Sequence, residues 1–271
     1  MYNETYIKIL LSQMFDHITN TFQGDEELLF VALKGSQNYD LDTIESDFDF
    51  VGVILKDLHQ SIFPKYNPTK RYLETPYGCI TLITYTEFCQ MLCKQNPSFL
   101  EILFTKYREI HPLYENQLQP LFEHAETLSS WNFYKQRTSM LGQITERIKE
   151  YHNETAQHKT KKAAKHLAMG YYLYEFLTRR TDNYTMHECY SITNFPKKTQ
   201  EFLIKLKNNQ IPTQEQFLYA QKLQEISAEY HEITKNKYYN HTCPTDIQNI
   251  LVSVYKDCIL TYLQKGDTTC N

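Results

Sequence analysis

Residues 34–52 read KGSQNYDLDTIESDFDFVG, and this stretch decides the fold. It joins two short apolar runs, 28–33 and 48–55, whose composition is typical of strands. Alternate residues of a strand point to the same side, so Asp47 and Asp49 are expected to share one face while the phenylalanines beside them take the other. Two like charges side by side at a strand end are destabilising unless something neutralises them. The pattern therefore indicates a site for a divalent metal ion.

The same stretch carries the residue types that bind a triphosphate. Transfer of a phosphoryl or nucleotidyl group places negative charge on several oxygens, and carboxylate-held metal ions are a standard solution. Asp47 and Asp49 offer the oxygen ligands that Mg²⁺ or Mn²⁺ takes. Gly35 lets the backbone approach a phosphate closely. Ser36, expected at a helix N-terminus, would offer its hydroxyl and the neighbouring amides.

Composition limits the class of protein. Apolar residues make up 41% and charged residues 22% of the 271 residues, which is ordinary for a globular domain. The 7 glycines are few, which favours helices over an all-β fold. The net charge of −4 argues against a surface that coats nucleic acid in general. No segment has the apolar length of a membrane span, so no membrane partner is expected.

The N-terminal residues and the cysteines predict a cytoplasmic location. The first residues, MYNETYIKILLSQMF, lack the basic start and the cleavage site of a signal peptide. The 7 cysteines are therefore expected to stay reduced. Cys89 and Cys93 lie one helical turn apart, but no second pair or histidine partner has zinc spacing. The sequence therefore predicts free thiols.

The pattern of apolar residues predicts an α+β fold. An amphipathic helix over 4–22 precedes the two strands, a loop is expected over 57–78, and a third strand over 80–85. Thr86 is the expected cap of a helix ending near Lys94, and Asn96-Pro97 opens another helix. Further helices are expected near 115–125, 130–155, 159–178, 197–208, 213–236 and 245–264, with a break over 181–195. We predict a small mixed sheet with flanking helices over 1–112 and a helical domain over 113–271.

Several segments together resemble a known family. The segments are GSQNY…SDFDFVGV, ITLITYTEF and QNPSFLEILF, which lie within residues 30–105. They resemble the DNA polymerase β-like nucleotidyltransferase superfamily, and in particular the minimal nucleotidyltransferases that are common in bacteria and phages. The resemblance implies an enzyme that moves a nucleoside monophosphate from a nucleoside triphosphate such as ATP to an acceptor hydroxyl. An RNA end, a protein or a small molecule remain open as the acceptor.

The resemblance also implies roles for individual residues. Gly35 and Ser36 match the triphosphate-binding turn, and Asp47 and Asp49 match the pair that binds metal. The family usually supplies a third carboxylate from a later strand, where this chain has Cys79. Glu74 is the nearest upstream carboxylate, and we name it as the third catalytic candidate.

Basic residues open the expected helix over 159–178. Lys162 and His166 lie one helical turn apart and are candidates, with Lys165, for contacts to the nucleotide phosphates or to RNA. A solvated helix face is the alternative. In the preceding helix, RIKEYH resembles the Arg-x4-His motif of HEPN ribonucleases, through Arg147 and His152. A surface salt-bridge network explains that motif equally well.

Two other hypotheses remain open at this stage. Without a third carboxylate, the chain could bind a nucleotide or an RNA end and act through a partner, without catalysis. AMP transfer onto a partner protein is a further variant of the enzymatic hypothesis.

Overall fold

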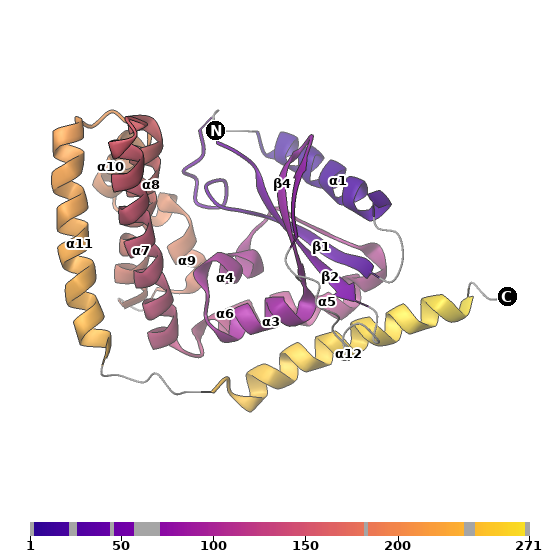
Figure 1. Ribbon diagram of the computed structural model, residues 1–271. Helices are drawn as coiled ribbons and strands as arrows, with labels where there is room; N and C mark the ends of the chain where they lie inside the picture. Colours follow the sequence, from indigo (N-terminus) through magenta and orange to yellow (C-terminus); the bar gives the residue numbers. More distant parts are fainter. Residues whose placement is uncertain are drawn as a thin grey trace.

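The computed structural model describes residues 3–21, 26–43, 46–56, 71–181, 184–235 and 242–268. In these residues a mixed sheet with flanking helices is followed by a helical region (Figure 1), which confirms the predicted α+β class.

The sheet has five strands in the order β3-β4-β2-β1-β5. Strand β1 (Glu26–Lys34) runs antiparallel to β2 (Asp49–Lys56), and β2 runs parallel to β4 (Gly78–Thr84). The two edges are β3 (Arg71–Thr75), antiparallel to β4, and β5 (Arg108–Ile110), antiparallel to β1. Strands β1 and β2 are buried almost throughout, as expected for apolar runs at the centre of a sheet.

The edge strands are absent from the sequence prediction. Strand β3 lies in the segment expected to be a loop, 57–78, of which 57–70 fall outside the described residues. Its residues alternate between half-buried and exposed, and β5 has only half-buried residues. Edge strands with few buried side chains have a weak apolar pattern in the sequence. They are recognised in the structure by their pairing with a neighbouring strand.

Helices cover both faces of the sheet. Helix α1 (Glu4–Thr21), as predicted, packs an apolar stripe against one face, where it meets Phe50. Helices α3 (Tyr85–Cys93) and α4 (Pro97–Phe104) cover the other face. The cap of α3 is Thr84 and not Thr86, because Thr84 and Glu87 form a reciprocal capping box. Asn96 caps α4, as its Asn-Pro start predicts.

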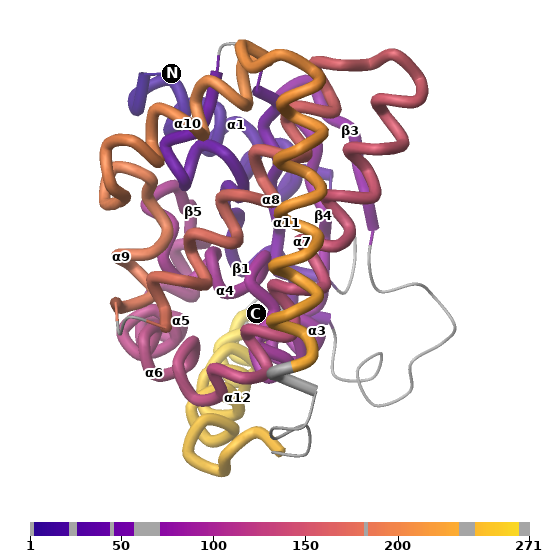
Figure 2. The backbone as a smooth tube through the Cα atoms, turned by 90° about the vertical axis from the view of Figure 1, so that its left-hand side faces the viewer, coloured from indigo at the N-terminus to yellow at the C-terminus, as the bar shows by residue number. Residues whose placement is uncertain are grey.

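Among the described residues, the helical region contains the helices expected from the sequence, together with two further short helices and two 3₁₀ turns. Figure 2 shows α11 crossing in front of α7 and α8. The stretch that breaks the pattern, 181–195, holds the short helix α9 and the 3₁₀ turn η2 in its described part. The elements are η1 (Pro112–Tyr114), α5 (Glu115–Glu123), α6 (Ala125–Ser130), α7 (Phe133–Ala156), α8 (Thr160–Thr181), α9 (Met186–Tyr190), η2 (Ile192–Asn194), α10 (Lys197–Lys207), α11 (Thr213–Lys235) and α12 (Thr245–Thr268).

The last helix, α12, lies apart from the other C-terminal helices. It packs against α5 beneath the sheet (Figure 1), and the Tyr85 hydroxyl donates to the Leu251 carbonyl at 3.2 Å. One apolar cluster contains residues of the sheet, of α8 and of α12. The division at residue 112 therefore stays a prediction. Within the described residues, none of the helices combines the length and apolar character that crossing a bilayer requires.

Candidate nucleotide site

A cavity of about 290 Å³ lies between one end of the sheet and helices α7, α8 and α10. The end of β1, the start of β2 and the segment between them contribute Lys34, Gly35, Ser36, Tyr39, Ser46, Asp47 and Asp49 to its wall. The structure thus brings the predicted phosphate turn and the predicted metal pair to the same cavity.

Glycine at position 35 is required by the backbone. Gly35 has a φ of 91°, and a Cβ atom there would meet nothing within 4 Å, so conformation and not crowding selects glycine. The following residues form hydrogen-bonded turns, in which Asn38 N–H donates to the Gly35 carbonyl at 2.9 Å and Leu41 N–H to the Ser36 carbonyl at 3.0 Å. The expectation that Ser36 begins a helix is wrong: residues 36–40 form turns, and Asp40 has a left-handed backbone conformation with a φ of 56°.

The two aspartates sit at the start of β2. Asp47 precedes the strand, Asp49 begins it, and both are exposed along the cavity. Gln37 Nε2 donates to the Asp47 carbonyl at 2.9 Å, which ties the phosphate turn to the metal pair. Asp49 stands opposite Lys34 in the β1–β2 ladder, while Phe48 packs on the opposite face with the α1 cluster. The predicted alternation of faces is therefore confirmed.

The position of the expected third acid can be read from the sheet register. Cys79 stands directly opposite Asp49 in the parallel β2–β4 pair, and Glu74 stands directly opposite Cys79 in the β3–β4 pair. Strands are about 4.8 Å apart, so Glu74 is separated from Asp49 by roughly 10 Å. A hydrogen bond with Cys79 raises the pKa of Tyr72, at this same edge, to about 12. The structure does not bring Glu74 into the cavity wall.

A buried glutamate supports the phosphate turn. Glu101, on α4, lines the cavity, is 3% exposed, and accepts hydrogen bonds from the Tyr39 hydroxyl and, at 3.4 Å, from Gly35 N–H. Burial raises the pKa of Glu101 to about 7, although Tyr39, Lys34 and the Gly35 amide oppose the rise. The sequence analysis missed this residue. The sequence feature that could have revealed Glu101 is that it is the one acidic residue in the otherwise apolar run FLEILF.

A buried lysine connects α10 to the loop ahead of Asp47. The Lys207 ammonium lines the cavity and donates to the Leu41 carbonyl and, at 3.3 Å, to Ser46 Oγ. Burial lowers its pKa to about 8, with a further contribution from Lys165. Sequence reasoning missed Lys207, because its pattern on α10 is that of an ordinary polar residue.

Cations from α7 and α8 line the wall that faces the aspartates. Arg147 Nη1 lies 3.3 Å from His166 Nδ1, and both side chains line the cavity together with Lys165. Burial, helped by the Arg147 guanidinium, lowers the pKa of His166, so the imidazole is neutral at pH 7. Lys162 lies outside the cavity wall, where its ammonium pairs with Glu154 Oε1 at 2.6 Å.

A second group of possible metal ligands lies at this edge. Glu150, Glu154 and His166 present ligand atoms that all lie within 4.8 Å of one another. The Lys162 ammonium pairs with one oxygen of Glu154 and Lys159 lies 3.8 Å from the other, so the charge of Glu154 is already compensated. This group is better explained as an ion-pair network.

The side chains of the ribonuclease-like motif have separate surroundings. Arg147 faces the cavity, whereas the His152 ring packs against Tyr151 and against Phe217 of α11, with ring centroids 6.0 Å apart in the second pair. Five positions along a helix turn these side chains to different faces. The side chains of Arg147 and His152 therefore do not belong to one site.

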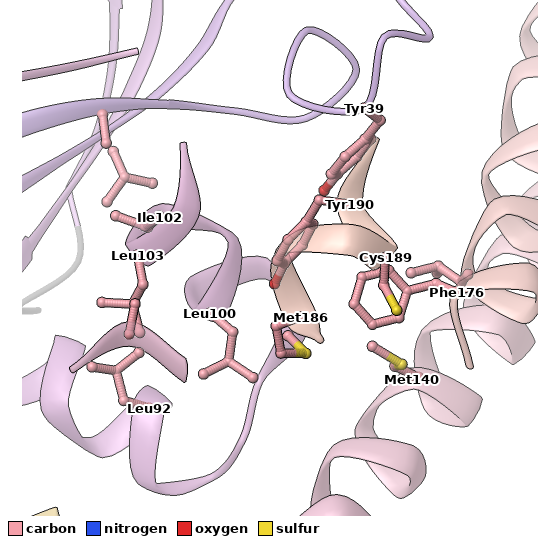
Figure 3. Close-up of a cluster of buried hydrophobic side chains, with 14 of the residues drawn as sticks. Tyr39, Leu92, Leu100, Ile102, Leu103, Met140, Phe176, Met186, Cys189 and Tyr190 are labelled. Carbon is pink, nitrogen blue, oxygen red and sulfur yellow. The ribbon is translucent and has the colours of Figure 1, made fainter. Parts of the chain in front are cut away.

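The deep end of the cavity is aromatic and apolar. Tyr39, Tyr172 and Tyr190 line it, with the Tyr39 and Tyr172 rings stacked at 4.4 Å between centroids. Figure 3 shows Tyr39 reaching from the turn toward Tyr190 of α9, near Phe176 and Met140. The Tyr190 hydroxyl is buried without a hydrogen-bond partner among the described residues. This oxygen lies inside the packed wall, on the side of Leu100 and Met186, and not at the cavity surface (Figure 3).

Comparisons with known proteins add a distant likeness to a solved structure. No protein-family model matches the chain. No curated protein matches it either. Among solved structures, the chain is similar to a nucleotidyltransferase-like protein from Exiguobacterium sibiricum, with a TM-score of 0.36 and 10% identity over 96% of this chain and 92% of that one. A likeness this distant assigns neither activity nor residue roles, so membership of the DNA polymerase β-like superfamily stays a prediction from the motif.

Proposed function

We propose that the protein is a metal-dependent nucleotidyltransferase that moves a nucleoside monophosphate from a nucleoside triphosphate to an acceptor hydroxyl. One observation carries the proposal: the Gly35–Ser36 turn and the Asp47–Asp49 pair line the same cavity, facing cations from three helices. Arg147 comes from α7, Lys165 from α8 and Lys207 from α10. A ligand with several negative charges fits between these walls.

The aspartate pair fits Mg²⁺ or Mn²⁺. Mg²⁺ is commonly held by one or two carboxylates together with substrate phosphates and water. Asp47 and Asp49 are exposed, line the cavity at the start of β2 and lie beside the phosphate turn. When bound there, the metal would offset negative charge on the triphosphate and orient it for displacement of pyrophosphate.

The remaining residues bind and orient the substrate. The turn at Gly35 and Ser36 would contact the phosphates, and Lys165 and Arg147 would balance their charge. The aromatic end, formed by Tyr39, Tyr172 and Tyr190, would contact the nucleobase. The neutral imidazole of His166, held by Arg147, is the cavity's candidate to accept a proton from the attacking hydroxyl.

Binding is tested first by calorimetric titration of ATP, GTP, CTP and UTP with and without Mg²⁺. Wild type should bind at least one triphosphate in a Mg²⁺-dependent manner, and Asp47→Asn/Asp49→Asn should lose at least tenfold in affinity while keeping its melting temperature. Asp16→Asn, the same exchange at an exposed position of α1, is the matched control and should bind as wild type does. Equal affinity in wild type and in the double variant would refute the metal site.

Binding without transfer is the second candidate, and the register of the sheet favours it. A thiol, Cys79, stands where the family resemblance expects an acid, and Glu74 lies outside the cavity wall. Release of pyrophosphate from a bound triphosphate separates the two functions. Steady release that Asp49→Asn abolishes supports transfer. Tight Mg²⁺-dependent binding without release over a panel of RNA, protein and small-molecule acceptors supports the binding function.

A further inference from the structure

Two cysteines that are 150 positions apart in sequence meet at the base of the molecule. Cys93 is the last residue of α3, and Cys243 lies two residues ahead of α12. Their sulfur atoms are 3.1 Å apart. The sequence analysis considered only Cys89 with Cys93 and expected free thiols, because nothing local connects Cys93 to Cys243.

We propose that Cys93 and Cys243 form a reversible disulfide that fastens α12 to the sheet region when the protein meets a peroxide or a low-molecular-weight disulfide. A disulfide bond is about 2.05 Å long, so the two sulfur atoms need to approach by only about 1 Å. Both side chains are half-buried, which leaves them accessible to a small oxidant.

The other described cysteines are less suited to this pairing. Cys189 and Cys258 are buried. Cys89 lies one helical turn before Cys93 on the same helix, and Cys79 lies on β4, where its side chain is hydrogen-bonded with Tyr72. Burial and the hydrogen bond with Cys93 raise the pKa of Cys243 to about 12, so this thiol is protonated in the reduced protein at neutral pH. Proximity is therefore what distinguishes the Cys93–Cys243 pair.

The location gives the bond a mechanical consequence. Apolar side chains of α12 are buried in the main cluster, and two polar contacts add to them: Gln117 Nε2 donates to Thr261 Oγ1 at 2.9 Å, and Lys265 pairs with Glu27 at 2.5 Å. The Tyr85 and Tyr255 rings stack at 5.7 Å between centroids. A bond at Cys243 would add a covalent anchor at the start of this helix. It would also close a long loop in the unfolded chain, which stabilises the fold by restricting that chain.

The chemistry balances with either oxidant. With hydrogen peroxide, one thiol is oxidised to a sulfenic acid and releases water. The second thiol then attacks that sulfur, and the disulfide forms as a second water leaves, so two thiols and one peroxide give one disulfide and two waters. With oxidised glutathione, two exchange steps release two glutathione thiols.

The test begins with the full-length wild-type protein, reduced with dithiothreitol, desalted and treated with hydrogen peroxide or oxidised glutathione. Remaining thiols are blocked with N-ethylmaleimide, and the digested protein is analysed by mass spectrometry. We expect a linked peptide that joins Cys93 to Cys243, and a melting temperature at least about 5 °C above that of the reduced protein, reversed by dithiothreitol.

Variants locate the bond. Cys89→Ser, the matched control one turn earlier on α3, should keep the linked peptide and the rise in melting temperature. Cys93→Ser and Cys243→Ser should each lose both. The proposal is overturned if the wild-type digest shows Cys93 and Cys243 blocked as free thiols, or either one linked to another cysteine. It is also overturned if the Cys93–Cys243 peptide forms and the melting temperature does not change.

Discussion

Replacing Glu101 with glutamine should remove a pH dependence of stability that this one carboxyl group creates. Burial raises the pKa of Glu101 from an ordinary 4.5 to about 7. Between these pH values the folded protein holds a proton that the unfolded chain has released. The stabilising contribution of this proton is complete below about pH 4.5 and is lost as the pH rises toward 7. Glutamine keeps the shape and the acceptor oxygen for Tyr39, and it does not titrate.

The magnitude follows from the width of that pH window. Each pH unit contributes about 1.4 kcal/mol, so ionising Glu101 costs about 3 kcal/mol by pH 8. Glu101→Gln should therefore exceed wild type in free energy of unfolding by up to about 3 kcal/mol at pH 8. At pH 5, where the Glu101 carboxyl is protonated, the two proteins should agree within about 1 kcal/mol.

Urea unfolding followed by circular dichroism at pH 5, 6, 7 and 8 measures this difference directly. Subtracting the variant from wild type at each pH cancels the titration of all other groups. Glu201→Gln, the same exchange at an exposed position of α10, should leave the pH dependence unchanged. Parallel curves for wild type and Glu101→Gln across this range would show that Glu101 is ionised throughout, and the argument from burial would fail.

Three further substitutions test the turn, the buried lysine and the aromatic end of the cavity. Gly35→Ala should lower the free energy of unfolding by about 1–2 kcal/mol in urea titrations, because φ there is 91°. Gly142→Ala, inside α7 with open space around it, is the control and should raise the free energy of unfolding by about 0.5–1 kcal/mol. A loss of stability at both positions would contradict the conformational explanation. Lys207→Met should weaken triphosphate binding about tenfold in calorimetry, because it frees the loop ahead of Asp47 and removes a cation from the cavity. Lys205→Met, at an exposed position of the same helix, should bind as wild type does. Equal affinities of wild type and Lys207→Met would exclude Lys207 from the site. Tyr190→Phe should leave the free energy of unfolding within about 1 kcal/mol of wild type in urea titrations, since the buried hydroxyl has no hydrogen-bond partner among the described residues to lose. A clearly larger loss would show that this hydroxyl is hydrogen-bonded in the folded protein.

Local chemistry in the sequence predicted part of the candidate site. Gly35, Ser36, Asp47 and Asp49 form one short stretch, and turn and strand geometry place them together at a sheet end, as the structure shows. The same kind of reasoning placed most helices, because the apolar spacing of an amphipathic helix is written in neighbouring residues. It failed for Ser36 as a helix start and for Thr86 as a cap, where hydrogen bonds to specific partners decide the conformation.

The opposite wall of the cavity depended on tertiary structure. Arg147, Lys165 and Lys207 come from three helices. Lys162 lies one turn from His166 and is a lysine like Lys165, yet it pairs with Glu154 outside the cavity. Periodicity shows that a helix has a polar face, but it does not show which partner that face meets.

The sequence by itself determined the α+β class, the position of most elements and the phosphate turn with its aspartate pair, because each depends on residues close together in the chain. Tertiary structure decided that Glu101 supports the turn, that α12 returns to the sheet region and that Cys93 meets Cys243. The physical reason is that packing between distant segments is selected by the shape and apolar area of whole surfaces, which no short stretch of sequence encodes.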